Sequence, residues 1–80
     1  MNIGEAVAAR MLELCEQHHI TLNKLGTISG VTQSTLNNIV NGGSKNPTVS
    51  TVKKVCDGLD MSLKQFFDAE VFSELEQEVQ

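Results

Sequence analysis

The stretch TLNKLGTISGVTQSTLNNIVNG, residues 21–42, has the pattern of two short helices joined by a tight turn. Thr21 can cap the first helix through its hydroxyl group, and Gly30 can adopt the left-handed backbone conformation that ends this helix. The apolar side of the first helix consists of Leu22, Leu25 and Ile28. The sequence therefore predicts two helices packed against each other across a glycine turn.

The second helix of this pair has two contrasting faces after its predicted cap at Thr32. Leu36 and Ile39 lie three residues apart on one face, with Val31 just before them. The opposite face carries only uncharged polar side chains, namely Gln33, Ser34, Asn37 and Asn38. Residues 31–44 contain no charged side chain, whereas an ordinary surface helix is rich in Lys and Glu.

Carboxamide side chains on such a face can read DNA. Gln or Asn presents a donor and an acceptor side by side and can bind adenine bidentately in the major groove, which is worth about 1–3 kcal/mol of base discrimination. A merely polar surface helix is the alternative interpretation. Because a turn glycine separates two capped helices, the sequence favours a helix-turn-helix that reads the major groove.

The chain resembles the Cro/CI-type (xenobiotic-response-element) helix-turn-helix domains of phage repressors and bacterial regulators over about residues 10–67. The residues that carry this resemblance are Leu25 with a small neighbour, Gly30-Val31-Thr32, Thr35-Leu36 with Ile39, Asn41-Gly42, Asn46-Pro47-Thr48, and Leu59-Asp60-Met61-Ser62-Leu63 before Phe66-Phe67. The resemblance implies a compact, all-α, five-helix fold like that of lambda repressor, in which helices 2 and 3 form the motif.

The resemblance also implies roles for particular residues. The residues expected to face the bases are Thr32, Gln33, Ser34, Asn37 and Asn38. The residues expected to hold phosphates, at the start of the preceding helix and in the loop after the motif, are Thr21, Leu22, Lys24, Asn41, Lys45 and Asn46. At Leu22 the family usually has Gln, so only the backbone amide is expected to contact a phosphate there.

The remaining helices follow from caps and apolar spacing. Asn2 with Glu5 predicts a capped helix over residues 3–17. Thr48 is the predicted cap of a fourth helix, and Ser62 with Gln65 forms a predicted capping box at the start of a fifth. Their expected core residues are Val7, Met11, Leu14, Val49, Val52, Val55, Cys56, Leu59, Leu63, Phe66 and Phe67. Eighty residues make one domain, which we expect over residues 1–68, followed by a tail over residues 69–80.

Charge is distributed unevenly along the chain. Residues 1–16 carry a net −2, residues 17–56 a net +4 and residues 57–80 a net −6, which gives the formal −4 of the whole chain. A surface that binds DNA needs positive charge locally, but the net charge of the whole chain need not be positive. The acidic tail could add a helix with one apolar face made of Val71, Phe72, Leu75 and Val79, which would supply a dimer contact. A tail folded back on its own core and a frayed end are the alternatives.

Other function classes find little support. No apolar run approaches the about 20 residues of a membrane span, Glu5 interrupts any signal-peptide core, and the two cysteines are expected to be reduced packing residues. Cys15 with His18 and His19 supplies fewer ligands than a closed zinc site needs, so we expect no metal. The sequence also has no catalytic nucleophile with its base and no Gly-rich phosphate loop, so neither an enzyme nor a cofactor is expected.

The sequence therefore predicts a cytoplasmic regulator of transcription that binds double-stranded DNA sequence-specifically, most simply as a repressor occupying an operator. The low positive charge of residues 17–56 predicts a homodimer on DNA, since one protomer offers few phosphate contacts. We expect no small-molecule effector and no membrane partner. The alternative is a protein-interaction module or antitoxin-like partner on the same fold, in which the acidic end binds.

Overall fold

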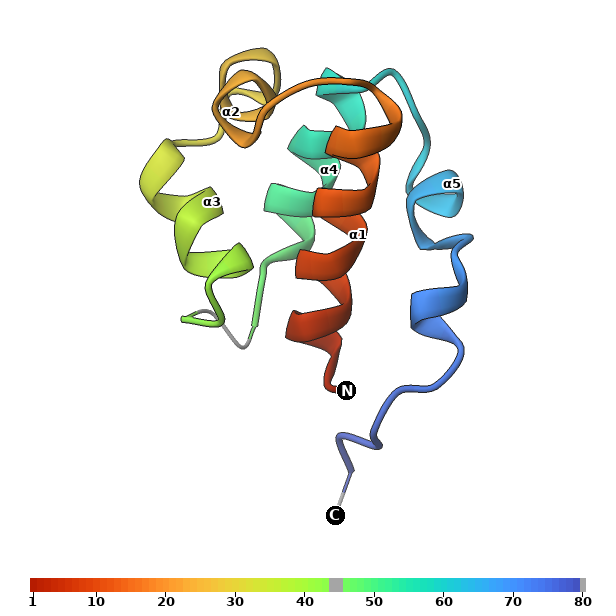
Figure 1. Ribbon diagram of the computed structural model, residues 1–80. Coiled ribbons are helices and arrows are strands. Elements are labelled where there is room, and N and C mark those ends of the chain that lie inside the picture. The colour runs from red at the N-terminus through yellow and green to blue at the C-terminus, as the bar shows by residue number, and fades with distance from the viewer. Residues whose placement is uncertain (44–45, 80) are drawn as a thin grey trace.

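A computed structural model describes residues 1–43 and 46–79, and within them it contains helices and no strand (Figure 1). The helices are α1 (Ile3–Gln17), α2 (Leu22–Ser29), α3 (Gln33–Val40), α4 (Val49–Gly58), α5 (Leu63–Phe67) and a 3₁₀ helix, η1 (Glu70–Phe72). The all-α, five-helix fold is therefore as the sequence predicts. Among the described residues, no helix is both long enough and apolar enough to cross a membrane.

Every α-helix begins at the cap that the sequence predicts. The Asn2 side chain accepts from the Glu5 amide over 2.8 Å, while the Glu5 carboxylate accepts from the Asn2 amide over 2.9 Å. Ser62 and Gln65 form the same reciprocal capping box at the start of α5. The hydroxyl-capped helices begin after Thr21, Thr32 and Thr48. These caps satisfy amide groups that have no partner inside the helix, and so they fix where each helix starts.

The helices pack around α1, which lies in the middle of the molecule (Figure 1). The α3 helix packs against α1, and α2 packs mainly against α4. In Figure 1, α3 lies on one side of α1, while α5 and η1 lie on the other. The side chains with almost no exposed surface are Met11, Leu25, Leu36, Val55, Cys56 and Phe66. They come from all five α-helices, so one shared core holds α3 in place.

Three side chains predicted for the core are exposed. Ile28 is 38% exposed, Val49 73% and Phe67 42%. Each stands at or near the end of a short helix: Val49 is the first residue of α4, Phe67 is the last of α5, and Ile28 is next to last in α2. Apolar spacing predicts which face a residue is on, but it does not reveal that a helix end extends beyond the core.

Arg10 is a buried charged residue that the sequence analysis did not single out. Only 8% of its surface is exposed. Its Nε donates to the carbonyl oxygen of Phe66 over 2.7 Å, its Nη2 donates to that of Gln65 over 3.0 Å, and its Nη1 pairs with the Glu13 carboxylate. The guanidinium therefore joins α1 to the end of α5, and its burial is compensated by charge-assisted hydrogen bonds.

The acidic tail does not form the helix considered for it. Only the single turn η1 is helical, and residues 73–79 follow without helix. Phe72 packs against the core, with its ring 4.9 Å from that of Phe67, and the Glu76 amide donates to the Met1 carbonyl oxygen over 3.1 Å. The possible tail helix is therefore absent, and the alternative of a tail folded back on its own core agrees with these contacts. A role of the tail in dimerisation stays a prediction.

Candidate nucleic-acid interface

The turn between α2 and α3 depends on two glycines. Gly30 has φ +71°, the left-handed conformation that the sequence predicts, and its amide donates to the Gly26 carbonyl oxygen over 2.9 Å. A Cβ atom at Gly26 would lie only 2.9 Å from the carbonyl oxygen of Val31. Residue 26 must therefore lack a side chain for α2 to approach the turn so closely, and the small residue next to Leu25 was the sequence signal for this.

The α3 helix is held by its apolar face, and its polar face is open to solvent. Leu36 and Ile39 are buried. The exposed residues of the predicted reading face are Thr32, Ser34, Asn37 and Asn38, and Gln33 is half-buried. Thr35 is exposed beside them, and its hydroxyl lies 2.8 Å from that of Thr32. The prediction gave Thr35 no role, although its position three residues after the cap places it on the exposed first turn.

Gln33 is held in a fixed position between α2 and α3. Its Nε2 donates to the Asn37 Oδ1 over 3.1 Å. On the other side, the Gln33 Oε1 lies 3.4 Å from the place of a Cβ on Gly26. Gln33 and Gly26 border a hollow of about 220 Å³ between the two helices, which Asn23, Thr27 and Val31 also line. The two carboxamides therefore form one hydrogen-bonded pair on the reading face.

At the other end of α3, the predicted phosphate residues of the loop approach the reading face. The Asn38 side chain lies against Gly43, whose amide donates to the Asn38 carbonyl oxygen over 2.8 Å. Asn41 and Asn46 are exposed, and Asn46 shares with Asn38 the lining of a hollow of about 130 Å³. Lys45 lies outside the described residues.

The start of α2 supplies the other predicted phosphate residues. The Thr21 hydroxyl accepts from the Lys24 amide over 3.0 Å, and both residues are exposed. The Leu22 side chain is partly buried and packs against the core. Leu22 therefore anchors the start of α2 to the core. The first amides of a helix have no partner within it and attract anions such as phosphate.

The geometry is that of two short helices joined by a tight turn, with the second helix presenting its polar side to solvent. A family model described as Helix-turn-helix matches residues 11–66. This chain belongs to the helix-turn-helix family. The match covers α2, α3 and α4 completely, begins within α1 at residue 11 and ends within α5 at residue 66. The matched family model is of the Cro/CI type that the sequence resembles. Helix-turn-helix proteins of this kind place the second helix of the motif in the major groove.

Two individual proteins resemble this helix-turn-helix chain. One is the HTH-type transcriptional regulator SlrR of Bacillus subtilis (strain 168), which is 42% identical over 50 residues. Those residues are 62% of this chain, and the match spans only about a third of the relative, 33% of its length. The other is the crystal structure of the prophage Lp1 protein 11, with a TM-score of 0.81 and 39% identity over 94% of this chain and 100% of that one.

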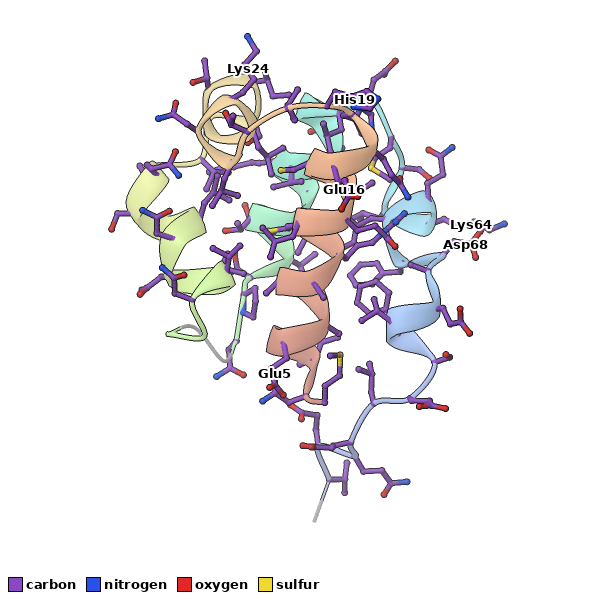
Figure 2. The ribbon with its side chains drawn as sticks, in the orientation of Figure 1. Glu5, Glu16, His19, Lys24, Lys64 and Asp68 are labelled. Carbon is purple, nitrogen blue, oxygen red and sulfur yellow. The ribbon has the colours of Figure 1, made fainter. Side chains whose placement is uncertain are left out.

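The charges of the helix-turn-helix domain are distributed unevenly in space. Lys24 lies beside α2, whereas Lys64 and Asp68 lie on the side of α5 (Figure 2). Lys53, which the sequence analysis counted toward the positive charge, pairs with Asp57 one turn along α4. An exposed pair of this kind contributes little to stability, but it reduces the positive charge available for phosphates. The η1 turn of the acidic tail lies on the side of α1 opposite α3, and the tail then runs past the start of α1 (Figure 1).

The two thiols lie in the core of the helix-turn-helix domain. Cys15 and Cys56 are both buried and free. Burial raises the pKa of each thiol, and the nearby carboxylate of Asp57 adds to the rise in the pKa of Cys56. Within residues 1–43 and 46–79, no group of three His, Cys, Asp or Glu side chains is placed to hold a metal ion. His18 and His19 are exposed, whereas Cys15 is not.

Proposed function

We propose that this chain binds double-stranded DNA sequence-specifically as a regulator of transcription, and that it acts as a repressor by occupying an operator. The observation that carries the proposal is the exposed, uncharged face of α3, with its carboxamides, in a helix-turn-helix whose buried Leu36 and Ile39 fix that face outward. Helices of such motifs read base edges with their first residues. The relative SlrR is named a transcriptional regulator, which supports the same role here.

In the proposed complex, α3 enters the major groove. Its Gln33–Asn37 pair meets the bases first, and Thr32, Ser34 and Asn38 lie at either side of that pair. The start of α2, with Thr21, the Leu22 amide and Lys24, lies against one phosphate strand. The loop after α3, with Asn41, Lys45 and Asn46, lies against the phosphates at the other end of the reading helix.

Two copies bind a near-palindrome in this proposal. The described residues of one protomer present few free positive charges, because Lys53 is paired with Asp57. A single domain gains little from phosphate contacts, whereas two domains on half-sites about 34 Å apart double the contacts to the same face of the duplex. We propose that residues 1–68 carry the DNA-binding function and that residues 69–80 form an accessory tail, in which Phe72 packs against the core and Glu76 contacts Met1.

The family consists of DNA-binding regulators and not of enzymes, and we propose no catalytic activity, no cofactor and no small-molecule effector for this chain. Its proposed place is the cytoplasm, where bacterial and phage operators are found. A protein-interaction or antitoxin-like role is the second candidate. It is favoured by one observation: the side chain of Leu22, where the family usually has Gln, packs against the core and offers DNA no polar group.

The deciding experiment is selection of bound duplexes from a pool of random double-stranded DNA. We expect enrichment of one motif by the wild-type chain. The matched control is the double variant Gln33→Ala/Asn37→Ala, which leaves the buried face of α3 unchanged and should enrich no motif or a different one. If the wild-type chain enriches no sequence above the starting pool, the sequence-specific function is wrong, and the protein-interaction role takes its place.

A further inference from the structure

An open groove of about 550 Å³ lies between α1 and the C-terminal end of α3. Its α1 wall includes Ala9 and Leu12, its α3 wall includes Val40, and Asn41 lies at its end. Leu12 is 48% exposed although it stands in the middle of α1, whereas the other large exposed apolar side chains of the α-helices stand at or near helix ends. Packing within one chain therefore leaves an apolar surface of α1 uncovered, and we call this surface the Leu12 groove.

The face of α1 that carries Leu12 has a carboxylate toward each end. In order along the chain, this face carries Glu5, Ala9, Leu12 and Glu16. Glu5 lies near the start of α1 and Glu16 near its end (Figure 2). Both are exposed, and Glu5 is the only charged residue among the described residues that line the groove. The groove is therefore apolar in the middle, with negative charge beyond both ends of that middle.

We propose that the Leu12 groove binds a basic amphipathic helix of another protein. When a helix binds in a groove, its apolar side chains on successive turns enter the groove. Here they contact Leu12 and Val40. Glu5 and Glu16 are separated by about 16 Å along the axis of α1, at about 1.5 Å per residue, which is the length of about three helical turns. Lys or Arg side chains near the two ends of a partner helix of that length can reach both carboxylates.

The charge of the groove determines which class of partner fits. A second copy of this chain has a net charge of −4, and its residues 69–80 add only negative charge, so Glu5 and Glu16 repel it. The same carboxylates repel the phosphates of DNA. The guanidinium of Arg10 does not offset them, because it pairs with Glu13 and donates to carbonyl groups of α5. A positively charged protein segment is the partner that these charges attract.

The apolar and acidic residues of the groove have different tasks. Buried apolar anchors at the centre of an interface supply most of its affinity. Exposed ion pairs at the rim add little affinity and mainly select the partner and speed its association. Glu5 caps α1 with one carboxylate oxygen and keeps a second oxygen for the partner. Leu12 therefore provides the affinity, and the two carboxylates provide the selection for a basic helix.

A bound partner should also inhibit DNA binding, and this part of the inference rests on the proposed function. Asn41, at the end of the groove, is also a predicted phosphate residue. An α-helix with its side chains is about 10 Å wide, so a helix in contact with Val40 also covers Asn41. The partner helix and the phosphate strand therefore compete for the same end of the groove.

The first test needs no DNA. A library of helical peptides displayed on phage is selected on the full wild-type chain, and the most enriched peptide is synthesised as the probe. We expect enriched peptides to carry apolar residues on successive turns with Lys or Arg beyond them. Leu12→Gln should weaken binding of the probe about tenfold or more. Val49→Gln is the matched control, since it removes an even more exposed apolar side chain outside the groove, and it should bind like the wild-type chain.

Three outcomes of this selection would overturn the proposal. They are the enrichment of no peptide, the enrichment of peptides without basic residues, and binding to Leu12→Gln as tight as to the wild-type chain.

The second test separates the local charge from the net charge of the chain. Glu16→Lys should weaken binding of the probe about two- to fivefold at low salt and less at high salt. A lysine suits the last turn of a helix, so α1 should tolerate this change. Glu74→Lys makes the same change of net charge in the exposed tail and should leave binding unchanged. Equal losses in the two variants would show attraction to the whole acidic chain and would refute the groove.

The third test adds the duplex that the random pool yields. The probe should weaken binding of the wild-type chain to this duplex but not binding of Leu12→Gln. A peptide of the same composition in scrambled order controls for binding of the peptide itself to DNA. Binding of the probe with undiminished affinity for the duplex would refute the competition. Failure to select any duplex would refute the proposed function instead, and the two peptide tests would still decide whether the groove binds a basic helix.

Discussion

Arg10 and Phe66 lie 56 residues apart in the sequence, yet the Nε of Arg10 donates to the carbonyl oxygen of Phe66 over 2.7 Å. The same guanidinium reaches the carbonyl oxygen of Gln65. Carbonyl groups at the end of a helix lack partners within the helix. Arg10 therefore donates hydrogen bonds to the carbonyl groups at the end of α5 and joins α5 to α1. The short helix α5 thus depends on a residue of α1.

Arg10→Met should destabilise the fold by about 1–3 kcal/mol, because it keeps much of the side-chain volume but removes the Arg10 donor from the buried contact with the Phe66 carbonyl oxygen. The Gln65 carbonyl oxygen would still accept from the Asp68 amide. The measurement is the free energy of unfolding from urea titration followed by circular dichroism. The control Glu13→Gln removes only the half-exposed partner of Arg10 and should change that free energy by less than about 1 kcal/mol. Equal effects from the two substitutions would show that the ion pair matters and the carbonyl contacts do not.

Gln33→Ala should weaken binding to the selected site by about 1–3 kcal/mol and relax the preference at one adenine. Asn37→Ala should weaken binding less, and the two effects should not add, because the Gln33 side chain donates to that of Asn37. Titration of each variant with the selected site and with single-base variants of that site gives the affinity and the base preference. Gln17→Ala, at the exposed end of α1, is the control and should leave them unchanged. Unaltered base preference in Gln33→Ala would refute the reading role.

Lys24→Ala should weaken binding to all sequences alike and lower the slope of log affinity against log salt by about one, since one phosphate contact is lost. Lys64→Ala removes the same charge from the side of α5, away from α2, and should leave the slope unchanged (Figure 2). The slopes come from fluorescence anisotropy over a series of salt concentrations. A loss restricted to one sequence, or identical slopes in the two variants, would contradict a phosphate role for Lys24.

The two buried thiols should make stability fall at alkaline pH. Burial raises the pKa of Cys15 and Cys56 in the folded chain, so the unfolded chain loses these protons first. Their contribution to stability is complete below the unfolded pKa of about 8.5 and is lost as pH rises through the folded pKa. Urea midpoints at neutral and alkaline pH test this, with Cys56→Ala as the variant whose decline should be smaller. Iodoacetamide should also label the folded chain far more slowly than the unfolded one, and equal rates would refute the burial effect.

A chain that ends at Asp68 should remain folded but lose about 1–3 kcal/mol of stability, because the Phe72 ring no longer packs against Phe66 and Phe67. Sedimentation with the selected duplex should show two copies bound by the short chain and by the full one. This outcome is expected because the tail helix that could have supplied a dimer contact does not form. Binding of a single copy by the short chain would restore a role for the tail in dimerisation.

Local chemistry was enough to predict where the helices start. Asn2, Thr21, Thr32, Thr48 and Ser62 each cap a helix because a short polar side chain can reach the amide three residues on, which is a local interaction. The reading face of α3 follows equally from its periodicity. Its role in binding DNA stays a prediction.

Features that depend on packing between residues far apart in the sequence could not be predicted. Val49 and Phe67 satisfy the apolar spacing of their helices, but whether a helix end reaches the core depends on the neighbouring helices. The partners of Arg10 lie more than 50 residues away, and no local pattern indicates them. The tail has helical spacing, yet residues 73–79 form no helix. Phe72 packs against the core, and the Glu76 amide donates to the carbonyl oxygen of Met1.

The absence of charge from residues 31–44 has a consequence for how the protein would respond to its ionic environment. Phosphate contacts weaken as the salt concentration rises, because release of the counterions of DNA into a more concentrated solution gains less entropy. Hydrogen bonds between carboxamides and base edges involve no net charge. A rise in ionic strength should therefore lower occupancy of every site together while the ratio between a correct site and one with a single wrong base pair stays nearly constant. If the proposed base and phosphate contacts are made, separate parts of the molecule control selectivity and affinity, and osmotic stress in a cell would change affinity without reducing selectivity.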